Sequence, residues 1–391
     1  MTHIVFFIGK LEVLDYFVKS MYENKDELLF DYYVADINNP ETYSSDAFYS
    51  YIQQKNVIAI LFNQVGLNLL IDGECVWKRY NIPVFDYIVD HPRNYSDTLL
   101  NPITDINAIV IDKSHEKFIR EFYPKVKSIF FLPNGGTPTD YARPYAQRDI
   151  DVIYTGSLKT KVINFPIFTE LGDKCQEFYN FTISLMLNYP DVATADAIEY
   201  YFKTNNYPDI DMDEYHNILL KLNLEAAPYI EIYVRREFQL RTILELDRAG
   251  ICVELYGKNW DMEESRFSDN IHIHSWITSD ECNQAVGRAK IALNCMPWYK
   301  EGCSERVFNN MLNGAVCVTD TSTYLTGRFN HGKELIFYNL DSLNEMAKVV
   351  KYLLDNTKVA EQIADRGRKA AIENDTWTKR LEKILEFANK I

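Results

Sequence analysis

Polar side chains in the segment "EGCSERVFNNMLNGAVCVTD" (301–320) stand at spacings that could bind a phosphorylated ligand. Ser304 is a natural N-cap, and the first N–H groups of the helix that it would begin suit a phosphate. Glu305 and Asn309 share one flank of that helix, because each residue turns it by about 100°. Glu301 lies in the loop before the helix. A carboxylate and an amide beside a diphosphate could hold the hydroxyls of a ribose and a sugar.

A strand–helix–strand unit has to position these residues. The sequence predicts a strand at "AKIALN" (289–294), a helix over 304–313 and a strand at "AVCVTD" (315–320), with Gly314 ending the helix. In such a unit the helix N-terminus lies at the carboxyl ends of the strands, where doubly wound sheets bind ligands. Spacing alone leaves a plain alternative, in which Asn309 and the loop acid are ordinary solvated residues.

Length and composition limit the class of protein. The 391 residues predict two domains, and 47% hydrophobic with 25% charged residues describe a globular chain. The net charge of −15 argues against a nucleic-acid partner or an anionic membrane surface, and no apolar run is long enough to span a bilayer. No basic segment precedes the first apolar run, so we expect no signal peptide. Seven cysteines without a Cys-x-x-Cys pair predict reduced thiols and a cytoplasmic location.

Short apolar segments alternate with helical ones, which predicts parallel α/β sheets covered on both faces. The pattern restarts with the strand–glycine unit "DVIYTGSL" at 151. The predicted strands are 3–8, 31–36, 56–63, 82–90, 106–112, 128–136 and 151–158, then "ICVELYGKNW", "IHIHSW" and the two strands above. The predicted domains are 1–146, 147–375 with a helical insertion at about 161–249, and a C-terminal helix at 376–391 that we expect to pack back on the first domain.

The opening segment resembles the donor-site signature of GT-B glycosyltransferases, and most closely that of the spore-maturation CgeB-type branch. That branch has the approximate pattern "dRvFnamlnGavvvtD", where this chain has "SERVFNNMLNGAVCVTD". The resemblance continues in order through "VFDYIVDHP", "FFLPNGGT", "IDVIYTGSL" and "VELYGKNW", and leaves out roughly 161–235. It implies a GT-B fold, with two Rossmann-like doubly wound α/β domains facing across a cleft and a helical insertion in the second.

The resemblance implies a donor site in the second domain. Lys258 or Arg306 would supply positive charge to the leaving nucleotide diphosphate, and Tyr256 or Trp260 would pack against the base. The structural alternatives are an exposed lysine and a core tryptophan. Glu301 would contact the donor sugar or its ribose. The predicted donor-binding residues are Gly156, Ser157, Tyr256, Lys258, Asn294, Ser304, Glu305, Arg306 and Asn309.

One position departs from the general GT-B motif, which has a second glutamate where this chain has Asn309. That glutamate normally accepts hydrogen bonds from the nucleotide ribose. An amide can still accept and donate but contributes no charge. We therefore expect donor binding to be retained.

The first domain is expected to hold the acceptor. Asp90 and His91 follow an apolar strand, and either could act as general base toward an acceptor hydroxyl, although Asp90 could equally be a turn residue. Gly9 lets the backbone approach a ligand closely, and Asn63 and Gln64 could bind acceptor hydroxyls. The predicted catalytic residues are Asp90, His91 and Glu301, and the predicted acceptor-binding residues are Gly9, Asn63 and Gln64.

Two patterns in the sequence resemble metal-binding motifs, but neither is complete enough to predict a metal site. His272 and His274 alternate onto one face of a strand, but no third ligand lies nearby in the sequence, so we interpret them as structural. "DIDMDE" (209–214) resembles the Asp-x-Asp motif of GT-A enzymes but falls in the helical insertion, so we interpret it as a solvated turn. We expect no metal and no cofactor.

The predicted function is metal-independent transfer of a sugar, of the hexosyltransferase class, from a UDP- or GDP-sugar to a hydroxyl of a surface protein or glycan. Two alternatives remain. The lack of the second glutamate would suit an inactive GT-B module that binds a glycan or a partner. A nucleotide-sugar epimerase shares the two-domain shape, but it needs further acid and base groups around the sugar, and none can be picked out.

Overall fold

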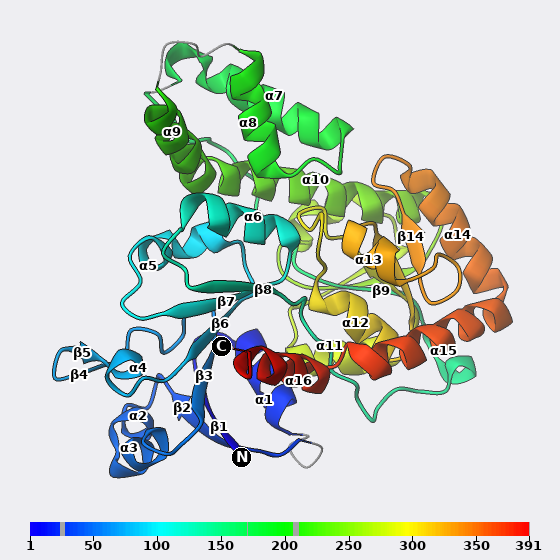
Figure 1. Cartoon of the computed structure of the whole chain (residues 1–391). Coiled ribbons are helices and arrows are strands. Elements are labelled where there is room, and N and C mark those ends of the chain that lie inside the picture. Colours follow the sequence, from blue (N-terminus) through cyan, green and yellow to red (C-terminus); the bar gives the residue numbers. More distant parts are fainter. Residues whose placement is uncertain (24–27, 170, 206–210, 391) are drawn as a thin grey trace. The chain divides into compact units, whose positions relative to one another are not determined.

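The computed structural model describes residues 1–23, 28–169, 171–205 and 211–390, which divide into two compact units (Figure 1). Unit 1 consists of Met1–Pro138, Thr278–Glu281 and Ala370–Ile391, and unit 2 of Thr139–Ile277 and Cys282–Lys369. The C-terminal segment thus belongs to the same unit as the N-terminal strands. None of the described helices is both long enough and apolar enough to cross a membrane.

Unit 1 is built on a parallel sheet with the strand order β2-β1-β3-β6-β7-β8. The side chains of β3, β6 and β7 are buried along their whole length, as expected for strands covered on both faces. In this order the chain reverses direction across the sheet between β1 and β3, and ligands bind at the carboxyl ends beside such a switch point. The strands are β1 (Thr2–Ile8), β2 (Phe30–Asp36), β3 (Val57–Phe62), β6 (Val84–Ile88), β7 (Ile106–Val110) and β8 (Ser128–Phe131), with a separate hairpin of β4 (Leu70–Ile71) and β5 (Glu74–Cys75).

The C-terminal helix α16 (Trp377–Ala388) supplies part of the core of unit 1. The ring of Trp377 lies 4.4 Å from Phe17 and 5.7 Å from Tyr87, centroid to centroid. Arg380 pairs with Asp375 at 2.9 Å, and both side chains are buried. The other helices of unit 1 are α1 (Glu12–Tyr22), α2 (Glu41–Ser44), α3 (Asp46–Ile52), α4 (Val76–Arg79), the 3₁₀ helix η2 (Pro92–Tyr95), α5 (Ser96–Leu100) and α6 (Lys113–Phe122).

Unit 2 is built on a second parallel sheet, with the order β11-β10-β9-β12-β13-β14. Read from the first strand of this unit, this is the 3-2-1-4-5-6 order of dinucleotide-binding folds, whose switch point lies between the first and fourth strands. Here those strands are β9 and β12. The strands are β9 (Ile150–Thr155), β10 (Val253–Tyr256), β11 (Ile271–His274), β12 (Ala289–Asn294), β13 (Val316–Asp320) and β14 (Ile336–Tyr338).

Helices α7, α8 and α9 pack against one another and against the long helix α10 (Figure 1). Helical structure starts later than predicted, because residues 156–168 form no helix and α7 begins at Cys175. The helices are α7 (Cys175–Asn188), α8 (Thr194–Thr204), α9 (Met212–Glu225), α10 (Ala227–Arg248), α11 (Ser279–Val286), α12 (Glu305–Leu312), α13 (Thr323–Arg328), α14 (Leu343–Asp355) and α15 (Thr357–Asn374). The first residues of α11, up to Glu281, and the last of α15, from Ala370, belong to unit 1. The 3₁₀ helices η3 (Tyr145–Gln147), η4 (Gly172–Lys174) and η5 (Asp261–Arg266) complete this unit.

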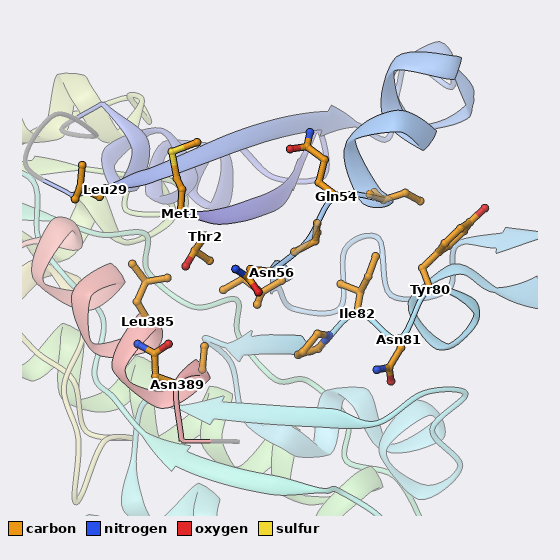
Figure 2. Close-up of a pocket in the computed structure, with 15 residues that line it drawn as sticks. Met1, Thr2, Leu29, Gln54, Asn56, Tyr80, Asn81, Ile82, Leu385 and Asn389 are labelled. Atoms are coloured by element: carbon orange, nitrogen blue, oxygen red, sulfur yellow. The ribbon is translucent and has the colours of Figure 1, made fainter.

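A cavity of about 790 Å³ lies at the amino ends of β1, β3 and β6 in unit 1 (Figure 2). Thr2, Asn56 and Ile82 line it from the strand ends, and Leu385 lines it from α16. Ligands of parallel α/β sheets bind at the opposite, carboxyl edge. The functional sites are therefore expected at the carboxyl ends of the strands.

Candidate functional sites

The predicted donor residues gather around the switch point of unit 2. Gly156 directly follows β9, Asn294 ends β12, and α12 begins at Glu305 in the next connection. Asn294 is fully buried, and its side-chain amide donates to the hydroxyl of Thr319 on β13 (3.0 Å). This asparagine therefore ties neighbouring strand ends together.

Arg306 reaches from α12 onto the turn after β9. Its Nη1 donates to the carbonyl of Thr155 (3.3 Å), and its side chain is 18% exposed. A Cβ added at Gly156 would lie 2.4 Å from the same Nη1. A side chain at Gly156 would therefore displace the guanidinium from this position.

A second arginine, Arg235 of α10, shares an aromatic platform with Arg306. Its guanidinium carbon lies 3.5 Å from the ring centroid of Trp298, and that of Arg306 lies 5.9 Å from the same ring. Such geometry gives cation–π attraction. Burial lowers the pKa of Arg235, and Arg306 adds to this because it is another positive charge. Arginine nevertheless stays charged at any working pH, so two cations converge here.

The N-terminus of α12 differs from the prediction in one respect. Ser304 takes the N-cap position, but its side chain makes no capping hydrogen bond. Its hydroxyl lies instead 3.5 Å from Oδ1 of Asn294. The N-cap side chain thus leaves the first N–H groups of α12 to other acceptors, and that end of the helix favours an anion.

The acidic and amide residues of the opening segment lie close to this helix end. Glu301 and Asn309 are partly buried, and Asn309 accepts at its backbone carbonyl from the backbone N–H of Asn313 (3.1 Å). A carboxylate oxygen of Glu305 lies 4.0 Å from Nε of Arg306. The ligand contacts proposed for these residues stay predictions.

The turns after β9 and β10 are joined by a hydrogen bond. The hydroxyl of Ser157 accepts from the backbone N–H of Lys258 (3.0 Å). The Lys258 ammonium is exposed and lies 5.5 Å from the ring centroid of Trp276. Its contact with a diphosphate stays a prediction.

The two aromatic candidates for packing the base differ in burial. Trp260 has no exposed surface, and its indole N–H donates to the carbonyl of Gly156 (2.7 Å). The prediction that it stacks on a base is therefore wrong: it is a core residue that supports the glycine turn. Tyr256 is partly buried and stacks on His274, with the ring centroids 4.3 Å apart.

The two histidines of β11 share a carboxylate that was overlooked in the sequence. Nδ1 of His272 lies 2.7 Å from Oε1 of Glu254 on β10, and Nε2 of His274 contacts the other oxygen of the same carboxylate. Within the described residues, no group of three or more His, Cys, Asp or Glu side chains could hold a metal ion. The pairing ties an edge strand to its neighbour, which agrees with a structural role.

The Asp-x-Asp-like segment falls partly outside the described residues, which leave out Asp209 and Ile210. Asp211 is the N-cap of α9 and accepts from the backbone N–H of Glu214 (2.8 Å). This part of the segment begins a helix of the insertion and does not follow a strand of the sheet.

In unit 1, Gly9 follows β1 at the switch point and adopts a left-handed conformation with φ of 100°. A Cβ there would lie 2.2 Å from Oδ1 of Asp36 and 2.6 Å from Nδ2 of Asn38. The absence of a side chain at Gly9 thus lets its backbone lie close to the side chains of Asp36 and Asn38. Its predicted contact with an acceptor is untested.

Asn63 and Gln64 follow β3, on the other side of that switch point, and both have left-handed φ angles, 50° and 63°. The backbone N–H of Gln64 donates to Oδ1 of Asp86 (2.9 Å), a fully buried acid in the middle of β6. Burial raises the pKa of Asp86 to about 7, against the opposing effect of the hydrogen bond from Gln64. The two strand ends are therefore held together by an acid that is largely uncharged below neutral pH.

Asp90 and His91 differ in their capacity to accept a proton. Asp90 is exposed at the end of the β6 segment, and its Oδ2 accepts from Nδ2 of Asn63 (2.9 Å). Nδ1 of His91 accepts from the backbone N–H of Arg93 (3.2 Å), so Nε2 carries the proton of the neutral ring. Burial, with smaller effects of Arg93 and His115, holds the pKa of His91 well below its usual value. His91 therefore has no free lone pair for a substrate proton.

Comparisons with known proteins agree with this architecture. Residues 235–386, less than half of the chain, match a family model described as glycosyl transferase-like. A search of curated proteins finds no match. An alpha-glucosyltransferase in complex with UDP and a 13-mer DNA matches with a TM-score of 0.55 at 9% identity, over 100% of both chains.

Two further solved structures match. Alr3699/HepE of Anabaena, in complex with UDP-glucose, matches with a TM-score of 0.53 at 9% identity, over 100% of both chains. With TarM the identity is 13% and the TM-score 0.46, and the match spans 86% of this chain but 55% of that one. The first two whole-chain matches show the GT-B fold, with its two Rossmann-like parallel-sheet domains. Residues 235–386 are thus similar to glycosyl transferase-like proteins. Membership of the CgeB-type branch stays a prediction.

Proposed function

We propose that this protein is a glycosyltransferase that moves a sugar from a UDP- or GDP-sugar to a hydroxyl of a surface protein or glycan. The observation that carries the proposal is the pair of guanidiniums at the switch point of unit 2. Arg306 lies against Gly156, and Arg235 and Arg306 both lie near the ring of Trp298. Guanidinium groups match phosphate oxygens in shape and charge. The N-terminus of α12 adds partial positive charge.

In this proposal the arginines neutralise the charge that develops on the departing nucleoside diphosphate. They take the place of the divalent ion that an Asp-x-Asp motif would hold, so the reaction is metal-independent. Glu301 binds a hydroxyl of the donor sugar or its ribose, and Asn309 makes an uncharged contact with the ribose. Two of the matching structures contain UDP or UDP-glucose, which supports a uridine nucleotide as the first ligand to test.

Unit 1 binds the acceptor in this proposal, and Asp90 is its general base. Asp90 fits the role because it is exposed and because its neighbour His91 has its Nδ1 lone pair engaged. The cytoplasm is the proposed location.

A thermal-shift titration with UDP, GDP and UDP-glucose tests the donor site. A nucleotide at a hundred times its dissociation constant should stabilise the fold by about 2.7 kcal/mol. Arg248→Ala is the matched control, because this arginine lies at the exposed end of α10 and pairs with Glu245. It should keep the shift, whereas Arg306→Ala should lose most of it. If millimolar nucleotide leaves the melting temperature of the parent unchanged, the donor-site assignment is wrong.

Donor breakdown without an acceptor separates the proposal from its alternatives. A transferase leaks slowly by passing the sugar to water, an epimerase isomerises the donor, and an inactive binding module does neither. The same assay in EDTA tests metal independence, and activity that is lost in EDTA and restored by manganese would contradict it.

A further inference from the structure

The carboxylate of Asp90 is held by one oxygen. Nδ2 of Asn63 donates to Oδ2 at 2.9 Å, and the hydroxyl of Tyr95 donates to the same Oδ2 at 3.1 Å. The donors come from different segments, one after β3 and one in η2, which follows β6. Two donors on a single oxygen fix the orientation of the carboxylate and turn its Oδ1 away from them.

Asn63 has little freedom to move. Its side chain is 2% exposed, and its Oδ1 accepts from the backbone N–H of Val89 (2.9 Å). Its backbone N–H donates to the carbonyl of Tyr87 (3.0 Å). Asparagine suits the position because its amide donates and accepts at once and because it tolerates the left-handed φ of 50° found here.

Tyr95 is a donor whose state does not change with pH in the working range. Burial and the neighbouring Asp90 carboxylate raise its pKa above the usual value, so the phenol keeps its proton. A phenol held against a carboxylate makes a charge-assisted hydrogen bond, which is stronger than a bond between two neutral groups.

The titratable neighbours of this group are few and differ in role. Asp86 lies buried in β6 and contributes to the raised pKa of Tyr95. His91 adjoins Asp90 in the chain, but its Nδ1 accepts from a backbone N–H. Oδ1 of Asp90 and Oδ2 of Asp86 both lack a hydrogen-bond donor within the described residues, but Asp86 is fully buried whereas Asp90 is exposed, so Oδ1 of Asp90 is the oxygen that a substrate hydroxyl can reach.

We propose that Asn63 and Tyr95 are positioning residues for Asp90, which hold its Oδ2 so that its Oδ1 receives the proton of the acceptor hydroxyl. This inference rests on the proposed function. The O–H bond of the acceptor breaks and its proton goes to Oδ1. The acceptor oxygen then forms the new bond to the anomeric carbon. The bond from that carbon to the diphosphate oxygen breaks, and its electron pair leaves with the nucleoside diphosphate.

Tyr95→Phe is the first test, because it removes one hydroxyl and keeps the ring. Hydrolysis of UDP-glucose, with water as the acceptor, is the assay. We expect kcat to fall about tenfold, the size of one lost hydrogen bond to a charged group, with the donor KM within twofold.

Asn63→Asp is the second test. An aspartate can still accept from the N–H of Val89, but it places a like charge beside Asp90 in place of a donor. This variant should lower kcat further than Tyr95→Phe does, with the donor KM again within twofold. Tyr33→Phe is the matched control, because the Tyr33 hydroxyl donates to the carbonyl of Thr42 elsewhere in unit 1 (2.8 Å). It should leave kcat and the donor KM unchanged.

The outcomes distinguish this proposal from the proposed function. If the parent is active while Tyr95→Phe and Asn63→Asp keep its kcat, the positioning role is wrong and the transferase proposal stands. If the parent neither binds UDP-glucose nor hydrolyses it, both proposals fall together. A fall in kcat together with a rise of the donor KM by more than twofold would also overturn the positioning role, because general loss of structure would produce it.

Discussion

The two units place different chemistry at equivalent points of similar parallel sheets. At the switch point of unit 1 the strand ends carry amides and acids, with Asn63 donating to Asp90. At that of unit 2 they carry a glycine turn covered by Arg306, with Arg235 close by. The sheet order determines where a ligand can bind in both cases. In the proposed function, the side chains at the strand ends make the first place suit a hydroxyl to be deprotonated and the second a diphosphate.

The two units are alike in that each has a buried carboxyl group at a strand of its sheet. Asp86 lies in the middle of β6 and Asp320 ends β13, and burial raises the pKa of each to about 7. Asp86 accepts from the backbone N–H of Gln64 and Asp320 from that of Met296. Each acid therefore fixes a connection of its own unit, and each is tolerated because it can remain protonated.

The largest expected effect tests the separation of roles between the units. Asp90→Asn keeps the shape of the side chain and removes its ability to take a proton. Since general base catalysis contributes about 10²–10⁴-fold, turnover of UDP-glucose should fall by that range. The stabilisation by UDP should be unchanged, because the proposed nucleotide site lies in the other unit. Loss of UDP binding in this variant would contradict the separation.

The next effect belongs to unit 2. Arg306→Ala and Glu301→Ala each remove a charge-assisted contact worth about 1.5–3 kcal/mol, so turnover should fall by about one to two orders of magnitude. Arg306→Ala should also weaken UDP binding in a thermal-shift titration, unlike Asp90→Asn. Asn309→Ala should weaken donor binding only modestly, because no charge is lost. Normal transfer by both folded variants, Arg306→Ala and Glu301→Ala, would show that the chemistry lies elsewhere.

Much of the fold follows from local sequence, because parallel strands are short apolar runs. The strand 289–294 and the helix after Ser304 occur where they were predicted. Periodicity was weaker where a run is short or mixed, so β14, with three residues, was missed and helix was predicted too early after residue 160. The two-domain GT-B fold is confirmed by the solved structures.

The sites were predictable only in part, because their contacts join distant segments. Arg235 and Trp298 lie on different elements, and no local spacing connects them. The pairing of Glu254 with His272 depends on the strand register, in which these two residues lie opposite each other. Trp260 was ambiguous because an aromatic residue after a strand suits either a base platform or a core.

A smaller effect concerns stability. The native state holds the proton of Asp86 up to about pH 7, whereas an unfolded aspartate releases it near pH 4. The unfolding free energy should therefore fall as pH rises between these values, by a few kcal/mol at most, and then stay constant. The unfolding free energy of Asp86→Asn should not fall in this way, because asparagine does not titrate. The variant should therefore be more stable than the parent at pH 8, and the two should differ less at pH 5. Urea unfolding at both pH values measures the difference, and Asp320→Asn is the counterpart in unit 2.

The smallest effect compares the sheet edges of the two units. Each has a cross-strand pair of histidine and acid, His272 with Glu254 at 2.7 Å in unit 2 and His3 with Asp31 at 3.5 Å in unit 1. The hydrogen bond that His272 donates to Glu254 raises the pKa of His272, so this pair contributes stability below the unfolded histidine pKa, about 6.5. That contribution is lost as pH rises through the higher folded pKa. Because His272 is half exposed, solvent screening limits the effect to about 1 kcal/mol or less.

Glu254→Gln should therefore lower the urea midpoint slightly at pH 5.5 and leave it nearly unchanged at pH 9. Asp31→Asn is the matched variant in unit 1, where the histidine and the acid are farther apart, and it should change the midpoint less. A larger loss at pH 9 than at pH 5.5 for Glu254→Gln would mean that the carboxylate acts on the neutral imidazoles. Glu254 contacts a ring nitrogen of both His272 and His274. In that case it would stabilise the edge strand through these hydrogen bonds alone, and attraction between its charge and a protonated histidine would contribute nothing.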